Sequence, residues 1–318
     1  MLSSVKEHLR FPCPAPLVTR RRAIDETGLA AVRSAIQTHY HRGWRARESY
    51  TPEGYAQDLR QHLTQRLWQD RRLIVPWLNS MRPLQGSRIL EIGCGTGSST
   101  VAMAEQGAEV VGVDIDTDAL EVARVRLQAH ALKAELVSEN ITEFDVAGGR
   151  FDVAIFFACL EHMTLPERLA GLASVWRGLP KGGLLVVVDT PNRLWFYDPH
   201  TSWLPFFHWL PDEIAFQYSK RSPRPLFRDS YREETAEKML HFRRQGRGVS
   251  FHEFDIAIGP VETLRVPSSL SAYRGWRRRL GMSRQERRCQ ALLRSARPDL
   301  HQGWFDPSLD IAIQKATA

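Results

Sequence analysis

A glycine-rich turn followed by a single carboxylate is the pattern in this sequence that most clearly predicts chemistry. The segment ILEIGCGTGSST places glycine at positions 93, 95 and 97, directly after a short apolar run. Such glycines let the backbone turn tightly and let a ligand approach the N-terminus of the following helix. Asp114 lies twenty-one residues after Gly93, where a carboxylate can accept hydrogen bonds from both hydroxyls of a ribose. The sequence therefore predicts a nucleotide-binding site.

Two kinds of nucleotide site compete for this pattern. A dinucleotide site is expected to show G-x-G-x-x-G or G-x-G-x-x-A. Here Ser98 occupies the sixth position, the spacing is G-x-G-x-G, and Glu91 stands just before the turn. The glycine turn alone is a weak signal, so the choice between the two depends on the elements around it.

The elements that must hold this turn alternate through the middle of the chain. Short apolar, β-branched runs predict strands at residues 88–93, 109–114, 134–139, 151–158 and 183–190. The stretches between them predict helices at residues 98–106, 118–131 and 166–179. Continuous apolar strands that alternate with helices indicate a parallel sheet covered on both faces. We therefore expect an α/β, doubly wound fold with its ligand site at the carboxyl ends of the strands.

Four motifs in this order resemble class I S-adenosylmethionine-dependent methyltransferases of the small-molecule type, in a bacterial-looking subgroup. They are E-x-G-C-G-T-G at Glu91–Gly97, G-V-D at Gly112–Asp114, FDVAIFFACLEHM at Phe151–Met163 and LPKGGLLVVVDTPN at Leu179–Asn192. The resemblance covers roughly residues 60–260 and adds the last strand of the chain. It implies a Rossmann-like, mostly parallel seven-stranded sheet with an antiparallel last strand, and S-adenosyl-L-methionine as the cofactor.

The resemblance also implies which residues contact the cofactor. The backbone around Gly93 and Gly95 would hold the methionine part, with Glu91 near its ammonium group. Asp114 would bind the ribose, and Ile115 would flank the adenine. The other expected contacts are Cys94, Gly97, Cys159, Leu160, the N-terminal tyrosines Tyr50 and Tyr55, and Asn140, which stands where the family often has an acidic residue. The two cysteines are expected to pack as small side chains rather than to act as nucleophiles.

The chain around this core predicts further parts. We expect a flexible tail at residues 1–22, an N-terminal helical cap at 23–82, the cofactor-binding core at 83–190, an aromatic substrate lid at 191–228, and a C-terminal part of the core at 229–318 that carries an Arg-rich helical insertion at 264–297. Within the last part, the pattern predicts a helix at residues 229–246 and strands at residues 249–258 and 309–313.

Methyl transfer from a sulfonium needs alignment and exclusion of water, but no covalent enzyme intermediate. If the acceptor is a hydroxyl or an ammonium, a base must remove its proton. The candidates at the carboxyl ends of the strands are His162, Glu161 and His200, with His162 first because similar Glu-His pairs recur at this place in small-molecule methyltransferases. Catalysis by proximity alone, without a base, stays an alternative.

The stretch TPNRLWFYDPHTSWLPFFHWLP, at residues 190–211, holds three Trp, three Phe, four Pro and two His. It predicts neither an ordinary helix nor a central strand. Three interpretations stay open: a substrate pocket and lid, a patch that covers the core, or a surface for a membrane or a partner. For the first of these, the expected substrate contacts are Asn192, Trp195, Tyr197, His200, Trp203, His208 and Trp209.

Positive charge is concentrated in one segment. The chain of 318 residues has a formal net charge of +7, yet residues 264–297 alone hold ten Arg and a single acid, Glu286. A solvated basic face explains this pattern, and so does an anionic partner, which would be a phosphorylated or carboxylated substrate, an acidic membrane surface or RNA. RNA is less favoured because no RNA-binding module is recognisable and the aromatic residues are not interleaved with the arginines.

Composition limits the remaining classes of protein. The four cysteines lie far apart with no C-x-x-C pair, so we expect neither a disulfide framework nor a bound metal. No run approaches the length of a membrane span, and the first residues lack the apolar region of a secretory signal, which together predict a cytoplasmic protein.

The sequence thus favours an S-adenosylmethionine-dependent methyltransferase that acts on a small or medium organic acceptor with an apolar body. If the Arg-rich segment binds the substrate, this acceptor also carries a phosphate or a carboxylate. Oxygen is the first expectation for the methylated atom, with nitrogen and carbon as alternatives. Two other hypotheses are an RNA methyltransferase that uses the Arg-rich segment, and a methyltransferase-like binding protein without catalysis. The oligomeric state is left open.

Overall fold

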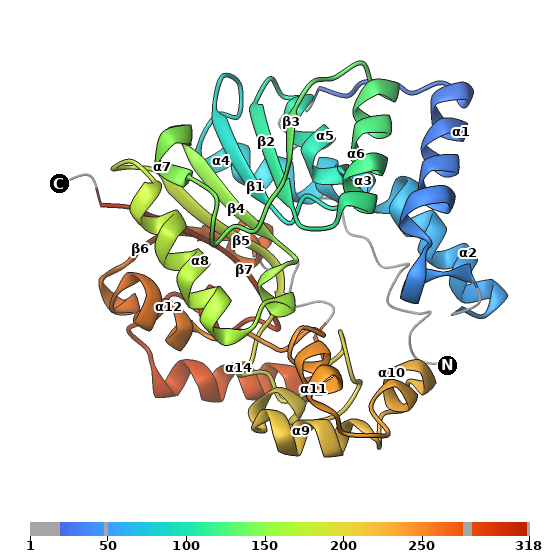
Figure 1. The fold of residues 1–318 in the computed structure, drawn as a ribbon. Coiled ribbons are helices and arrows are strands. Elements are labelled where there is room, and N and C mark those ends of the chain that lie inside the picture. The colour runs from blue at the N-terminus through green and yellow to red at the C-terminus, as the bar shows by residue number, and fades with distance from the viewer. Residues whose placement is uncertain (1–19, 48–49, 276–281, 317–318) are drawn as a thin grey trace. The chain divides into compact units, whose positions relative to one another are not determined.

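The computed structural model describes residues 20–47, 50–275 and 282–316 (Figure 1). Most of the tail expected at residues 1–22, and Arg277, Arg278 and Arg279 of the Arg-rich segment, lie outside the described residues. Among the helices that are described, none is long and apolar enough to cross a membrane.

Seven strands form one mixed sheet in the order β3-β2-β1-β4-β5-β7-β6. Their bounds are β1 Arg88–Ile92, β2 Glu109–Asp114, β3 Glu135–Ser138, β4 Val153–Phe157, β5 Leu184–Pro191, β6 Arg265–Ser269 and β7 Ser308–Gln314. β1 pairs in parallel with β2 and with β4, β2 pairs in parallel with β3, and β7 runs antiparallel to β6. The predicted α/β fold, with a mostly parallel seven-stranded sheet and an antiparallel last strand, is confirmed.

The chain divides into two compact units, which we describe separately. The glycine-turn unit comprises residues 20–157 and 177–185, and the lid unit comprises residues 158–176 and 186–316.

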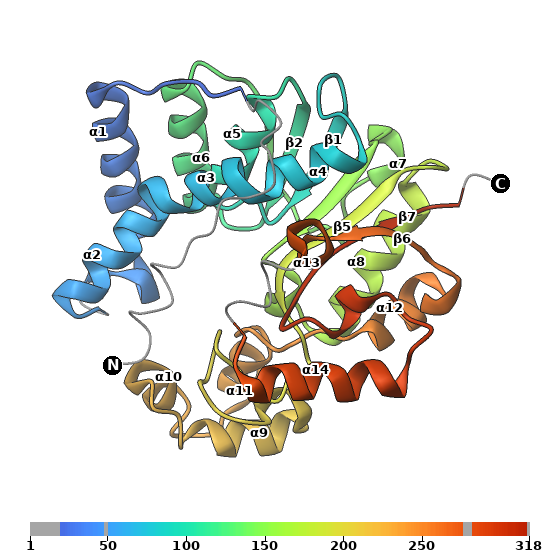
Figure 2. The same ribbon diagram turned by 180° about the vertical axis from the view of Figure 1, so that it is seen from behind.

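In the glycine-turn unit, helices follow one another from residue 26 to residue 81, where the N-terminal cap is expected. They are α1 Glu26–Ala35, η1 Ile36–Tyr40, η2 Gly43–Arg45, α2 Pro52–Arg60, η4 Gln61–Gln65, α3 Arg66–Gln69, η5 Asp70–Ile74 and α4 Val75–Met81. Figure 2 shows that α2, α3 and α4 continue one another as a nearly unbroken rod, in which η4 and η5 are π-helical turns.

Two core helices of this unit pack behind the glycine turn: α5 Ser98–Ala104 and α6 Thr117–Ala129. Every residue of α5 is buried, while α6 is capped by Asp116, whose side chain accepts a hydrogen bond from the Ala119 N–H at 3.1 Å. The cap packs on α6 through an apolar cluster formed by Val32, Ala35, Ile36, Leu59, Leu63 and Val122. This contact fixes the cap to the same helix that lies beside the glycine turn.

In the lid unit, one α-helix precedes β5 and further α-helices follow it. Their bounds are α8 Leu165–Gly178 (its last two residues belong to the other unit), α9 Asp212–Ser219, α10 Pro225–Ser230, α11 Ala236–Arg243, α12 Phe251–Ile258, α13 Leu270–Arg274 and α14 Arg284–Ala296. β7 lies where a strand is predicted at residues 309–313.

Three local predictions for this unit are wrong. The strand predicted at residues 249–258 is helix α12 from residue 251 on, because Phe251 and Phe254 are buried three residues apart, which is a helical spacing. The helix predicted at residues 229–246 breaks into α10 and α11, since Thr235 caps a new helix by accepting from the Lys238 N–H at 3.2 Å. The Arg-rich insertion is not helical throughout, because it begins with strand β6.

The aromatic stretch splits between a small core and the surface. Phe207 joins Phe216, Tyr231 and Phe242 in an apolar cluster that α9 and α11 complete. The Phe216 and Phe242 rings lie edge to face with their centroids 5.3 Å apart. The lid therefore has its own core, which extends beyond residue 228 to the end of α11.

We predict that Gly97→Ala destabilises the protein more than Gly86→Ala does. Both glycines have a left-handed φ (+77° and +74°), so alanine at either position costs about 1 kcal/mol of backbone strain. Only at Gly97 would the added Cβ meet another atom, the Cβ of Ala123 at 2.9 Å, which adds about 1–3 kcal/mol of overpacking. Urea unfolding measures both free energies, and equal losses would show that α5 and α6 do not meet this closely.

Candidate functional site

The glycine turn and Asp114 meet because β1 and β2 are adjacent parallel strands in register, with Ile92 opposite Val113. The backbone N–H of Gly95 donates to Asp114 Oδ2 at 2.8 Å, and the N–H of Asp116 donates to Oδ1 at 2.9 Å. Burial raises the pKa of Asp114, and these two hydrogen bonds act in the opposite direction. The carboxylate is thus held beside the turn, as its place in the sequence predicts.

Glu91 is fully buried beneath the turn. Its two oxygens accept hydrogen bonds from the hydroxyls of Ser99 and Thr100, the latter at 2.6 Å. Burial raises the pKa of Glu91 to about 7, against the effect of the two hydroxyls. The resemblance expects Glu91 near an ammonium group, whereas the structure shows it joining β1 to the first turn of α5.

The remaining cofactor residues expected near the turn have diverse surroundings. Ile115 is two-thirds exposed, with 66% of its surface accessible, and so is available to a ligand. Cys94 is buried, and Asn140 accepts a hydrogen bond from the Thr142 N–H at 3.1 Å. Cys159 and Leu160 belong to the lid unit.

A buried arginine, which no motif in the sequence singles out, joins the cap to the glycine turn. Arg126 on α6 donates to the backbone carbonyls of Thr96 at 2.7 Å, His62 at 2.5 Å and Leu63 at 3.2 Å. His62 and Leu63 lie in the π-helical turn η4, a type of distortion that often occurs at functional sites. Burial lowers the pKa of Arg126 to about 10, so the side chain keeps its charge.

The cap places Tyr40, Arg45 and His62 around the turn, although Tyr50 and Tyr55 are the expected residues. Arg45 donates to Asp116 Oδ2 at 2.6 Å, and its guanidinium lies 4.1 Å from the centre of the Tyr40 ring. Tyr40 packs on His62 with centroids 4.4 Å apart, and His62 Nδ1 lies 3.4 Å from the Thr96 hydroxyl.

Tyr50 and Tyr55 instead pack around His41, at centroid distances of 6.2 and 4.7 Å. No signal in the local sequence marks Arg45, since its contact to Asp116 spans 71 residues.

The lid unit brings the three candidate bases together. His162 ends the 3₁₀ turn η6 (Leu160–His162), which follows β4, and it is half exposed. Its Nδ1 lies 2.9 Å from the backbone carbonyl of Arg244, so this nitrogen must carry the proton. In a neutral ring, Nε2 is then the basic atom, 3.9 Å from Glu161 Oε1. The His200 ring lies 6.3 Å from that of His162.

Glu161 is fully buried next to this exposed pair of imidazoles. Its Oε2 accepts a hydrogen bond from the Thr190 hydroxyl at 3.2 Å, while Oε1 has no hydrogen-bond partner among the described residues. Burial raises the pKa of Glu161 to about 7, although a positive charge on His200 would lower it. An imidazole pair beside a carboxyl group of this kind can take up and pass on a proton.

The expected substrate contacts divide into buried and exposed residues. Asn192 is fully buried, and its amide donates to the carbonyls of Trp304 and Asp306, both at 2.8 Å. His208 is also buried, with Nδ1 accepting from the Gly248 N–H at 3.1 Å and Nε2 lying 3.3 Å from Asp198 Oδ1.

Trp195 is buried as well, whereas Tyr197, His200, Trp203 and Trp209 are exposed. The geometry favours the exposed four as ligand contacts and the buried three as their support.

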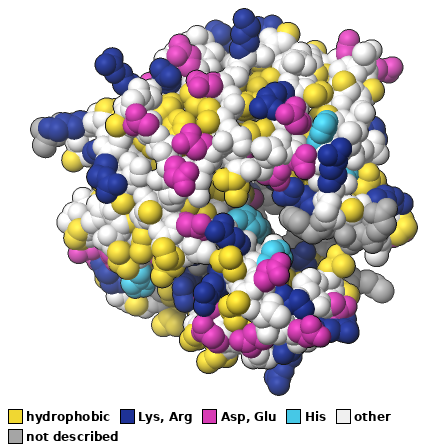
Figure 3. Space-filling view, in the orientation of Figure 1, with side chains coloured by type: hydrophobic (Ala, Val, Ile, Leu, Met, Phe, Trp, Pro, Cys, Tyr) yellow, Lys and Arg dark blue, Asp and Glu magenta, His cyan; other side chains and the backbone are white. Residues whose placement is uncertain are grey.

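The described part of the chain holds no group of three or more His, Cys, Asp or Glu side chains placed to bind a metal ion. Acidic and basic side chains are interspersed over the face shown in Figure 3.

Comparison with known proteins agrees with the geometry of the turn. Residues 89–183 match a family model described as a methyltransferase domain. They span the glycine turn, Asp114 and strands β1 to β4, the elements on which the resemblance to class I methyltransferases is based.

Similar proteins match about a third of the chain. A ubiquinone biosynthesis O-methyltransferase from Cereibacter sphaeroides is 38% identical over 116 residues, which are 36% of this chain and 46% of that protein. A protein of the same name from Paracidovorax citrulli is 37% identical over 125 residues, 37% of this chain and 49% of the relative. The chain thus spans about half the length of the curated relatives it matches.

Among solved structures, magnesium protoporphyrin IX methyltransferase from Synechocystis with bound SAM is similar at 22% identity, with a TM-score of 0.38, over 54% of this chain and 80% of that one.

We predict that Glu91→Gln removes a pH-dependent loss of stability. Below about pH 4.5, the ordinary pKa of a glutamate, the Glu91 carboxyl is protonated in both the folded and the unfolded chain, so the free energy of unfolding does not depend on its ionisation. As the pH rises from about 4.5 to about 7, the unfolded chain releases this proton while the folded chain keeps it, and the free energy of unfolding falls by up to about 3 kcal/mol. Glutamine cannot ionise, so the variant should gain stability relative to the wild type as the pH rises from about 4.5 to about 7.

Urea unfolding at several pH values measures this difference in the free energy of unfolding. Glu121→Gln is the control, because that carboxylate is half exposed. A constant difference between Glu91→Gln and the wild type across this pH range would contradict the assignment.

Proposed function

We propose that this protein transfers a methyl group from S-adenosyl-L-methionine to a hydroxyl of a small or medium organic acceptor with an apolar body. The observation that carries the proposal is the Asp114 carboxylate held by the Gly95 and Asp116 N–H groups at the glycine turn of a methyltransferase domain. A carboxylate in this position accepts hydrogen bonds from both hydroxyls of a ribose.

The residues around the turn fit such a cofactor. A Cβ added to Gly95 would meet no atom within 4 Å, so the turn borders open space. The exposed Ile115 directly follows Asp114 and offers an apolar surface to an adenine. When bound, the cofactor supplies an electrophilic methyl group on a sulfonium. Gly93, Gly95 and Gly97 would hold its methionine part, and Arg45 and Tyr40 would stabilise this side of the site through Asp116.

His162 is the proposed general base. Its Nε2 is unprotonated because Nδ1 donates to the Arg244 carbonyl, so Nε2 can accept the proton of an acceptor hydroxyl. Glu161 stabilises the imidazolium that results, since its Oε1 lies 3.9 Å from Nε2 and has no hydrogen-bond partner among the described residues. His200 is the alternative base, because it is exposed and lies beside His162.

Oxygen is the proposed methyl-accepting atom. The relatives described above are named O-methyltransferases, which supports oxygen over nitrogen or carbon. The exposed side chains of Tyr197, Trp203 and Trp209 offer the apolar surface that an acceptor with an apolar body needs.

RNA is a second candidate acceptor, because exposed arginines gather on α14. Arg284, Arg287 and Arg288 lie exposed on α14, and none of them forms an ion pair with another described residue. A steep fall of RNA affinity with rising salt concentration would favour this alternative.

We predict that Asp114→Ala lowers the affinity for S-adenosylhomocysteine at least tenfold in titration calorimetry. The variant loses charged hydrogen bonds worth about 1.5–3 kcal/mol each. Asp118→Ala is the control, because Asp118 is a half-exposed carboxylate in the first turn of α6, 3.9 Å from Arg42. Asp114→Asn removes the charge and one of the two backbone hydrogen bonds, since its amide oxygen can accept from only one of the Gly95 and Asp116 N–H groups. Undiminished affinity in the alanine variant would contradict the proposed site.

We further predict that His162→Ala lowers kcat at least tenfold and leaves the affinity for S-adenosylhomocysteine unchanged. The assay follows transfer of a labelled methyl group to a series of catechols with and without alkyl chains. His200→Ala is measured in parallel: a loss confined to His200→Ala would identify that residue as the base. If both variants kept full turnover, transfer would depend on proximity alone.

A further inference from the structure

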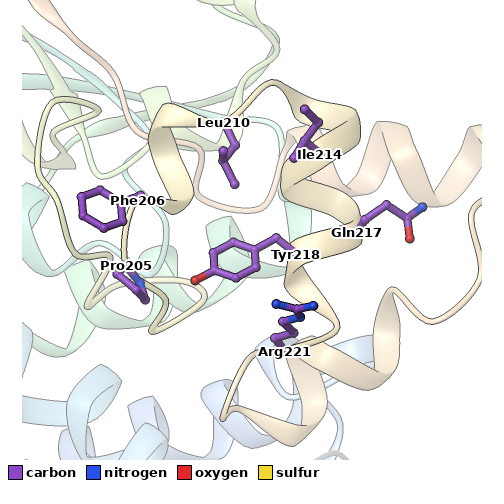
Figure 4. A pocket seen from close by; sticks show the side chains of 7 residues that line it. All are labelled: Pro205, Phe206, Leu210, Ile214, Gln217, Tyr218 and Arg221. Atoms are coloured by element: carbon purple, nitrogen blue, oxygen red, sulfur yellow. The ribbon is translucent and has the colours of Figure 1, made fainter.

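An open groove of about 390 Å³ runs along one side of α9 in the lid unit (Figure 4). It is lined by Pro205, Phe206, Leu210, Ile214, Gln217, Tyr218 and Arg221. This volume lies within the range of small-molecule sites, about 300–1,000 Å³. Figure 4 shows the Tyr218 ring crossing the groove with its hydroxyl toward Pro205, and the Arg221 guanidinium beside that ring.

The apolar part of the groove is held open to solvent by the backbone. Phe206 has a left-handed φ of +58°, which is uncommon for a bulky residue, and two hydrogen bonds fix it there. Its N–H donates to the Phe196 carbonyl, and its carbonyl accepts from the Trp209 N–H at 3.1 Å. Phe206 and Trp209 remain 48% and 49% exposed, and Ile214 is 57% exposed. Strained backbone that presents apolar side chains to water points to a ligand.

The polar end of the groove is cationic. Gln217 is already engaged, since its amide donates to Glu234 at 2.6 Å and its carbonyl accepts from Lys220 at 2.7 Å. Among the described residues, neither the Tyr218 hydroxyl nor the Arg221 guanidinium has a hydrogen-bond or ion-pair partner.

The acidic side chains of α9 lie at the other end of this helix and form ion pairs there. Asp212 pairs with Arg243 at 3.1 Å and with Arg247 at 3.2 Å. Glu213 pairs with Arg243 at 3.2 Å. No carboxylate of α9 is therefore left to pair with Arg221. The groove combines an apolar lining with the positive charge of Arg221 at one end.

We propose that this groove binds an amphipathic carboxylate or phosphate, with the apolar chain of the ligand along α9 and its anionic group at Arg221. Charge complementarity selects this occupant over an apolar segment of another protein, which would leave Arg221 unpaired.

Direct binding tests the groove without any methyl transfer. Dodecanoate is titrated into the full-length protein, and Trp fluorescence reports binding because Trp209 packs on Phe206 with centroids 4.9 Å apart. We expect saturable binding of dodecanoate and at least tenfold weaker binding of dodecyltrimethylammonium, which has the same chain and the opposite charge. Equal binding of the two ligands, or no binding of dodecanoate, would overturn the proposal.

Two variants locate the site. Arg221→Gln should weaken dodecanoate binding about fivefold, as expected for one exposed charge. Arg284→Gln, an exposed arginine on α14, is the matched control and should change nothing. Ile214→Asp should abolish binding by placing an anion in the apolar lining, without disturbing the buried face of α9. Normal binding by both Arg221→Gln and Ile214→Asp would place the ligand elsewhere and overturn the proposal.

Discussion

The hydrogen bond from the Gly95 backbone N–H to the Asp114 carboxylate is the contact on which the proposed function depends. It forms because two neighbouring parallel strands end at the same edge, one in a turn and the other in an acid. A carboxylate that is partly removed from water needs donors, and here the backbone provides two of them. The outer lone pairs then remain for a ligand, at a fixed distance from a turn whose glycines leave space beside the backbone.

Arg126 extends this constraint to the N-terminal cap. A buried guanidinium must have its N–H groups satisfied, and this one uses carbonyls of the turn and of η4. Two of these carbonyls, those of His62 and Leu63, belong to the π-helical turn. The cap is therefore bound to the glycine turn through its backbone, and this brings Tyr40, Arg45 and His62 to the edge of the site.

The sheet could be predicted from the sequence because its signals are local. Each strand from β1 to β5 is a short apolar run, and the spacing from Gly93 to Asp114 follows from one strand-helix-strand unit. The prediction failed at residues 249–258, where a short apolar pattern fits a strand and a helix equally well. The contact of Arg45 with Asp116 could not be foreseen, because it depends on how the cap packs on α6.

The aromatic stretch shows a similar limit. Its composition predicts an apolar surface, but not which rings are buried: Phe207 completes a core with residues of α9 and α11, while Phe206 is turned to solvent by its backbone. His208 and Asn192 look like ligand contacts in the sequence, yet their polar atoms bond the protein itself. Such assignments require the tertiary partners, which lie up to 114 residues away.

Titration calorimetry on the wild-type protein with two ligands measures whether the glycine turn and Asp114 bind S-adenosylmethionine. We expect S-adenosylhomocysteine to bind at a single site and NAD to give no heat of binding under the same conditions. Binding of NAD without binding of S-adenosylhomocysteine would show that the turn holds a dinucleotide instead.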